Sequence, residues 1–299
     1  MKSLSHRENA AVNPVRVPLV FQGGGVLGTA FIGAIKALEE LNILPSALAG
    51  ASAGAIICAL LAVGYSADEL LLLMKNKEFC EFLDPVCHIP GIRLLLFYLK
   101  KGIYKGDHFY EWLVDNLSIK MEESPIFADI PIPLFITATD ITRKKQFVAS
   151  QSNSKVLPVA DAVRMSMSLP FLFVPVKFGS SEIVDGGVVN NYPAPLLRQI
   201  TDKPILGFRL QSGKQPSHSR GWFDLAGRLM DSAIGAAADY HQATVKNLYT
   251  VHLPTLGIGV TDFGITKAQK LSLYQAGRHA TLAFFSSGKG REFLRRSQQ

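Results

Sequence analysis

The sequence is poor in cysteine and shows no cluster of histidines. Only Cys58, Cys80 and Cys87 occur in 299 residues, and the seven histidines do not gather near them. An odd number of cysteines without metal-ligand spacing argues against both a disulfide framework and a zinc site. We therefore expect a fold stabilised by its hydrophobic core, with no metal and no cofactor.

A cleavable signal peptide and an uninterrupted membrane span are also lacking. The first nine residues carry charges where a signal peptide needs its apolar segment. Residues 17–35 and 41–67 are long and uncharged enough for membrane helices, but glycines and Pro45 interrupt them. These features predict a cytoplasmic or peripheral membrane protein, or one exported by a route without a cleavable signal.

No nucleic-acid-binding motif accompanies the positive charge of the chain. The formal net charge is +7, yet lysine and arginine are scattered along the sequence. The charge is more consistent with contact to an anionic membrane surface than with a nucleic acid partner.

Composition and length predict one large folded domain. Hydrophobic residues make up 48% of the chain, which is enough to bury a full core. We expect an N-terminal extension over residues 1–14, a single domain over 15–285 and a basic C-terminal tail over 286–299. Strands and helices alternate along the domain, and this order predicts an α/β/α sandwich with a mainly parallel central sheet.

The individual elements follow from hydrophobic periodicity and turn residues. Val15–Phe21 is an apolar run that ends in glycines, which predicts a buried strand. Ser66 and Glu69 form a capping box at the start of a helix, and Asp107 is a candidate cap for another. The other expected strands are 47–49, 133–139, 146–149, 174–178, 182–184 and 204–210. The other expected helices include 31–41, one after Ser52 that runs through 56–61, 159–167, 222–248 and 267–285.

The pattern G-x-S-x-G points to a nucleophilic serine. It occurs as Gly50-Ala51-Ser52-Ala53-Gly54, after a short strand and before a helix. Such a serine lies in a strained strand-to-helix turn, so its neighbours must be small. Because the context fits, we interpret Ser52 as a catalytic nucleophile and not as part of a merely close-packed turn.

A run of three glycines lies between an expected strand and an expected helix, at Gly23, Gly24 and Gly25. Because glycine has no side chain, the backbone amides of such a loop can converge on an anion. We predict that they bind an oxyanion. The segment lacks the P-loop motif. Together with Gly28 it matches the G-x-G-x-x-G dinucleotide pattern, but the next strand ends in the serine turn and not in an acidic ribose contact.

A third motif, Asp185-Gly186-Gly187, is expected at a strand end. A lone Asp-Gly pair is usually a turn, so its meaning depends on Ser52. An ordinary α/β-hydrolase would add a histidine after the aspartate. The available histidines stand in helical, strand or loop patterns that favour none of them: His218, His241, His252 and His279.

These motifs together resemble the patatin-like phospholipase family, including its bacterial branch that contains phospholipase toxins. The resemblance spans residues 15–285 and includes four connecting segments, at 104–107, 137–140, 166–170 and 190–193. It implies the family's three-layer fold and a Ser52–Asp185 dyad that needs no histidine. It also implies that Gly23 to Gly25 hold the oxyanion, with Gly28, Gly50, Gly54, Gly186 and Gly187 shaping the loops around them.

The resemblance predicts hydrolysis of carboxylic esters in phospholipids, lysophospholipids or neutral lipids through an acyl-enzyme. Leu27 departs from the arginine or lysine usual in the family, which weakens the prediction of a phospholipid substrate. The apolar run Leu94–Leu99, followed by Lys100 and Lys101, is a candidate membrane-docking segment or a buried helix. The alternatives are an inactive lipid-binding scaffold of the same fold and a Ser-His-Asp esterase.

Overall fold

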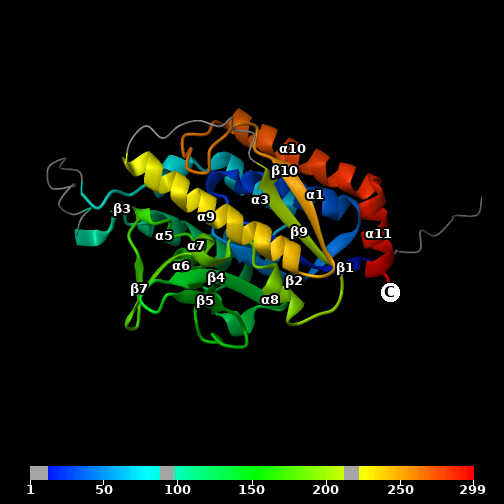
Figure 1. The fold of residues 1–299 in the computed structure, drawn as a ribbon, viewed down its shortest axis with the longest axis horizontal. Helices are drawn as coiled ribbons and strands as arrows, with labels where there is room; N and C mark the ends of the chain where they lie inside the picture. Colours follow the sequence, from blue (N-terminus) through cyan, green and yellow to red (C-terminus); the bar gives the residue numbers. More distant parts are fainter. Residues whose placement is uncertain (1–12, 88–96, 98, 212–221) are drawn as a thin grey trace, which may run out of the picture.

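The computed structural model describes residues 13–87, 97, 99–211 and 222–299. Their central element is an eight-stranded sheet with the order β10-β9-β1-β2-β4-β8-β7, in which β5 also pairs with β4 (Figure 1). The main-sheet strands are β1 (Val15–Phe21), β2 (Ile43–Ala51), β4 (Leu134–Asp140), β5 (Lys145–Ala149), β7 (Val176–Phe178), β8 (Ser181–Asp185), β9 (Ile205–Gln211) and β10 (Leu248–Pro254).

Helices cover both faces of this sheet. A second, two-stranded sheet joins β3 (Gly102–Tyr104) to β6 (Phe171–Phe173) at one end of the molecule. The α-helices are α1 (Thr29–Glu40), α2 (Ala53–Ala62), α3 (Ala67–Asn76), α5 (Asp107–Met121), α6 (Val159–Ser166), α7 (Gly187–Asn190), α8 (Ala194–Arg198), α9 (Trp222–Thr244), α10 (Lys267–Ser286) and α11 (Gly288–Ser297).

The sheet is parallel from β10 to β4, and β5 and β8 run antiparallel to β4. The predicted α/β fold with a mainly parallel sheet is therefore confirmed. Since the carboxyl ends of parallel strands meet at one edge, the loops after β1, β2 and β4 lie at the same end of the sheet. This edge carries the functional motifs described below.

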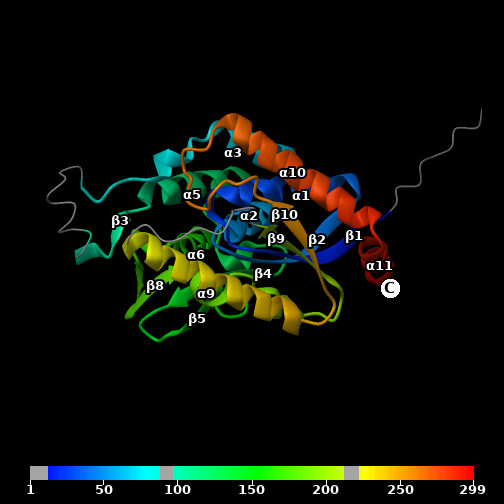
Figure 2. The same cartoon turned by 45° about the horizontal axis from the view of Figure 1, so that its top comes forward.

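Alternation along β1 divides the core into two parts. Successive side chains of a strand point to opposite faces. Phe21 packs with α1 and α2, whereas Val20 packs with Tyr192 and Ala238 near α8 and α9. Figure 2 shows α9 and α10 on opposite sides of the sheet.

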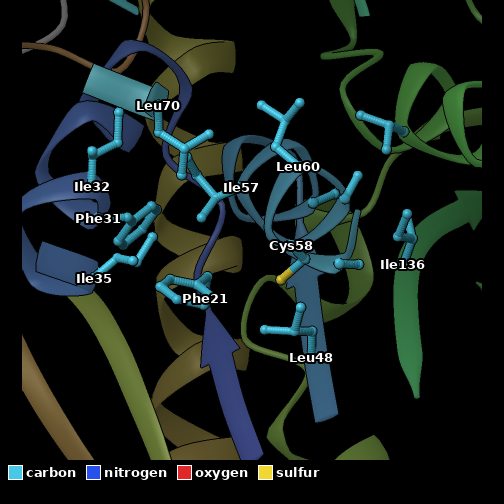
Figure 3. Packing of buried hydrophobic residues seen from close by; sticks show 14 of the residues in the cluster. Phe21, Phe31, Ile32, Ile35, Leu48, Ile57, Cys58, Leu60, Leu70 and Ile136 are labelled. Atoms are coloured by element: carbon cyan, nitrogen blue, oxygen red, sulfur yellow. The ribbon is translucent and has the colours of Figure 1, made fainter. Parts of the chain in front are cut away.

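Aromatic stacking organises the larger core. Phe21 stacks on Phe208 of β9, with ring centroids 5.1 Å apart, and meets the edge of Phe31 of α1 at 5.4 Å. Figure 3 shows Phe21 beside Phe31, with Cys58 of α2 close to Leu48 of β2. The motif loops thus emerge from a buried, tightly packed base.

Two predicted element boundaries needed revision. The predicted strand 47–49 lies within the longer β2, where a register shift between Val17 and Pro18 of β1 accommodates Pro45 in the pairing. The helix predicted over 222–248 ends at Thr244, and β10 begins at Leu248. Short apolar sequence does not distinguish a helix end from a buried edge strand.

Helix caps were predicted with mixed success. The capping box of α3 is confirmed, because the Ser66 amide donates to the Glu69 carboxylate at 2.8 Å and the Ser66 hydroxyl accepts from the Glu69 amide. Asp107 does not cap α5. Gly106 is the N-cap residue, and the carboxylate of Asp84 accepts from the amides of Gly106 and Asp107 at 2.6 and 3.0 Å.

Residues 286–299, expected to form a basic tail, include helix α11. Its Phe293 is 0% exposed and packs edge-on against Phe285 of α10 and Tyr249 of β10. The helix therefore adds to the core. Most of the predicted docking run, 94–96 and 98, lies outside the described residues. Within the described residues, no helix is long and apolar enough to cross a membrane.

We predict that Phe293→Ala lowers the free energy of unfolding by about 3–5 kcal/mol, because it leaves a cavity at a fully buried aromatic position. Chemical denaturation measures this difference. Arg295→Ala, an exposed change in the same helix, is the matched control and should stay within about 0.5 kcal/mol of the unmodified protein. Equal stability of both variants would contradict the packed position of α11.

Candidate active site

Ser52 stands alone between β2 and α2 in a strained backbone conformation. Its φ and ψ are 49° and −121°, a region that residues with a side chain rarely adopt. The neighbouring glycines permit this turn, because a Cβ on Gly50 would meet the backbone of Gly54, and one on Gly54 would meet the carbonyl of Phe21. The predicted strand-turn-helix context of Ser52 is therefore present.

A buried serine anchors this turn from a distant part of the chain. The Ser52 amide donates to the hydroxyl of Ser166 at 2.8 Å, and that hydroxyl donates to the carbonyl of Thr137 at 2.6 Å. Ser166 ends α6 and is fully buried. One side chain thus links the turn after β2 to β4. Sequence analysis did not identify this role, because the two serines lie 114 residues apart.

Asp185 is the last residue of β8, and both its backbone amide and its backbone carbonyl are hydrogen-bonded. It pairs with Ala138 of β4. Its amide donates to the carbonyl of Ser168 at 2.9 Å, and its carbonyl accepts from the hydroxyl of Thr139 at 2.9 Å. Because Thr137 of β4 pairs with Ala51 of β2, β4 lies between the strands that carry Asp185 and Ser52.

The carboxylate of Asp185 is buried and only partly satisfied. It is 2% exposed, and Oδ1 accepts from the Gly187 amide at 2.6 Å. Oδ2 has no partner of full hydrogen-bond geometry among the described residues. Burial raises the pKa of Asp185 from 3.8 to about 6, against the opposing effect of hydrogen bonding from the Ser52 hydroxyl and the Gly187 amide.

The glycine loop offers fewer free amides than the sequence predicted. The Gly23 amide donates to the carbonyl of Asn191 at 3.1 Å, so it is not available to an oxyanion in this conformation. The amides of Gly24 and Gly25 have no hydrogen-bond partner in the described part of the chain. Gly25 has φ +52°, where a side chain would be strained and would collide with Val260.

A further donor lies at the first turn of α2. The amide of Ala53 follows the nucleophile position and is not engaged by any described residue. The residue after the nucleophile supplies an oxyanion amide in α/β-hydrolases, a role that our prediction from the glycine loop did not include. Gly24, Gly25 and Ala53 are therefore the candidate donors.

The remaining motif glycines allow neighbouring segments to pack closely against their backbone. A Cβ on Gly28 would press on Ala53, one on Gly186 would collide with Thr137, and one on Gly187 would crowd the Asp185 carboxylate. Leu27 is buried in the larger core cluster. A charged side chain would be costly in that position, which accounts physically for the apolar residue there.

No described histidine completes a triad. His241 of α9, His252 of β10 and His279 of α10 make no hydrogen bond to Ser52 or Asp185, and His108 interacts with the carbonyl of Glu81. His218 lies outside the described residues. The described geometry accordingly brings Asp185, and none of these histidines, to Ser52.

We predict that Asp185→Asn stabilises the protein at neutral pH. A carboxyl pKa raised from 3.8 to about 6 means that folding is disfavoured by roughly 3 kcal/mol once the group is ionised. This penalty is absent below about pH 4 and complete above about pH 6. Thermal unfolding across this range should show a gain in stability for Asp185→Asn that disappears on acidification. A gain in stability that does not depend on pH would contradict a raised pKa for Asp185.

Comparison with known proteins agrees with the fold and identifies the family. A family model described as patatin-like phospholipase matches residues 19–198, which includes both Ser52 and Asp185. The uncharacterized protein YqhO of Bacillus subtilis (strain 168) is 33% identical over 282 residues, covering 89% of this chain and 96% of the relative.

A more distant relative is the probable lipid hydrolase 463L of Invertebrate iridescent virus 6. It is 25% identical over 182 residues, which cover 58% of this chain and 61% of the relative. Among solved structures, VipD from Legionella pneumophila superposes with a TM-score of 0.56 at 16% identity, covering 91% of this chain and 67% of VipD. That likeness supports the fold alone, whereas the family model and YqhO establish membership: the chain belongs to the patatin-like phospholipase family.

Proposed function

We propose that this protein hydrolyses carboxylic esters of lipids, with Ser52 as nucleophile and Asp185 as general base. Family membership and the lipid hydrolase name of a viral relative support lipid ester hydrolysis. The observation that supports these two roles is the buried Asp185 carboxylate. Its Oδ2 has no full hydrogen bond to a described residue, and its pKa of about 6 suits it to accept a proton from Ser52.

The reaction would proceed in two halves. The Ser52 hydroxyl attacks the ester carbonyl carbon as Asp185 takes its proton, and the oxyanion accepts hydrogen bonds from Gly24, Gly25 and Ala53. Collapse of this intermediate breaks the ester C–O bond, and Asp185 returns the proton to the leaving alcohol. Water, deprotonated by Asp185, then attacks the acyl-serine. The bond between the acyl carbon and Ser52 Oγ breaks, Asp185 returns the proton to Ser52, and the fatty acid leaves.

Neither alternative is supported by a specific observation. A Ser-His-Asp esterase would require a histidine beside Asp185, and no described histidine has that place. An inactive scaffold would not be expected to keep Ser52, Asp185 and unoccupied amides together. Phospholipids, lysophospholipids and neutral lipid esters are all candidate substrates, because Leu27 leaves the glycine loop without the usual cation.

We expect Ser52→Ala and Asp185→Ala each to reduce turnover by roughly 10³-fold or more, because members of one catalytic unit fail together. His241→Ala and His279→Ala should retain most activity. The measurement is kcat/KM on a panel of phospholipids, lysophospholipids and simple esters of graded chain length. An Asp185→Ala enzyme with nearly full activity would refute the dyad, as would a folded His241→Ala enzyme without activity.

Ser166→Ala should lower kcat by roughly 10²-fold with little change in KM, because the Ser52 turn loses its anchor while substrate contacts remain. The buried Ser52 amide also loses its partner, at a cost of about 1–3 kcal/mol in stability. Ser168→Ala is the matched control, since it removes a buried hydroxyl that bonds to Arg164. Equal kcat losses in both variants would contradict a positioning role for Ser166.

A further inference from the structure

Exposed apolar and basic side chains gather at one end of the molecule. The apolar members are Leu99, Ile141, Phe171 and Phe178, of which Phe171 is 53% and Phe178 41% exposed. The basic members are exposed lysines without an ion-pair partner among the described residues: Lys100, Lys105, Lys144, Lys145 and Lys177. We call these nine residues the lysine–aromatic surface.

Printed contacts place these segments side by side. Gly102 of β3 pairs with Phe171 of β6. Leu99 and Lys100 shortly precede Gly102 in the sequence, so they belong to the same segment. Lys101 then forms an ion pair with Glu182 of β8 at 2.7 Å. The ring of Phe178 meets Phe147 of β5 at 5.6 Å. β3 and β7 lie at the same end in Figure 1, and β3 and β8 do so in Figure 2.

This surface lies at the same end of the sheet as Ser52. Ser52 follows the carboxyl end of β2, and residues 141–144 follow the carboxyl end of β4, which runs parallel to β2. The tip of the β7–β8 hairpin is at this end as well, because β8 is antiparallel to β4. A flat partner that covers this surface would therefore approach the end of the sheet where Ser52 lies.

Phe171 is held in place at a conformational cost. Its φ is +68°, where a bulky residue is disfavoured, and yet its ring is left largely exposed. Exposure of a large apolar ring on a strained backbone gives the folded monomer no evident benefit. Outlying backbone of this kind is characteristic of functional positions.

The charge of this end is strongly positive. Among the described acids nearby, Glu182 pairs with Lys101, the buried Asp140 pairs with Arg143, and Asp84 and Asp107 lie close to the buried Arg164. The five lysines of this surface therefore outnumber the acids that could offset them. A cavity of about 450 Å³ opens here, and its wall includes Lys100, Lys105, Asp107 and the buried guanidinium of Arg164. This mixture of cations and exposed aromatic rings matches anionic headgroups above acyl chains.

We propose that the lysine–aromatic surface docks on an anionic lipid bilayer and holds the site at the lipid interface. The aromatic rings enter the headgroup region while the lysines contact lipid phosphates. The identity of the partner rests on the proposed lipid hydrolase function, but binding itself does not require catalysis. Beyond the run 94–99 that the sequence suggested for docking, this surface includes residues of β6, β7 and the β4–β5 turn.

The test separates binding from catalysis. Full-length Ser52→Ala protein is co-sedimented with vesicles of phosphatidylcholine alone and with vesicles that contain phosphatidylglycerol in roughly equal parts. We expect binding to the anionic vesicles that weakens as salt screens the lysines. Equal binding to both vesicle types, or none to either, would overturn the proposal.

Two variants and two controls locate the contact. Phe171→Asn removes the ring but suits a left-handed backbone, so folding is retained, and it should weaken binding about tenfold or more. Lys144→Gln with Lys177→Gln should weaken it roughly 30-fold. Ile200→Ser and Lys203→Gln alter similarly exposed residues before β9, at the opposite end of the sheet. If these controls weaken binding as strongly, the proposal fails.

An activity measurement distinguishes the two proposals. With Ser52 intact, Phe171→Asn should lower hydrolysis of vesicle-borne ester about as much as it lowers binding, and leave hydrolysis of a soluble short-chain ester unchanged. If vesicle-borne ester is cleaved as before, docking by this surface is refuted while the hydrolase function stands. If the unmodified enzyme cleaves neither ester although its Ser52→Ala form binds anionic vesicles, the hydrolase function fails and the docking surface stands.

Discussion

The burial of one incompletely paired carboxylate is the constraint on which the site depends. The ionised carboxylate of Asp185 is solvated better by water than by the protein interior. The pKa of about 6 reflects the free-energy cost of ionising the group where it is buried. Among the residues that the structure describes, only Gly187 makes a full hydrogen bond to this carboxylate, and it bonds to one of the two oxygens. In the proposed mechanism the second oxygen accepts the proton of Ser52. A base with a pKa near neutrality is well suited to that step, so the cost of burying the carboxylate serves catalysis.

The rest of the fold holds Ser52 and Asp185 in register. The parallel strands β1, β2 and β4 bring the glycine loop, Ser52 and Thr137 to one edge. Ser166 then ties the Ser52 amide to Thr137, and Asn191 ties Gly23 to the loop after Asp185. Strain at Ser52 is sustained by this network and by the aromatic core below it.

Sequence alone placed the candidate site residues at the strand ends where the structure has them, because the signals are local. Ser52 and Asp185 sit in short motifs at strand ends, and β1 was predicted with its observed bounds, since apolar runs and glycine turns lie within a few residues of each other. The contacts made by Ser166, Asn191 and Asp84 were missed because they join distant segments. The engaged amide of Gly23 and the packing of α11 through the single buried Phe293 likewise depend on tertiary neighbours that no local pattern encodes.

The pH dependence of covalent labelling by a fluorophosphonate would show whether Ser52 and Asp185 act as one catalytic unit. We expect the label to map to Ser52 and the labelling rate to rise through about pH 6 to a plateau, following ionisation of Asp185. In Asp185→Asn the rate should be far lower and should not change across that range. Labelling at another residue, or an Asp185→Asn protein that reacts as fast as the unmodified enzyme, would contradict this joint role.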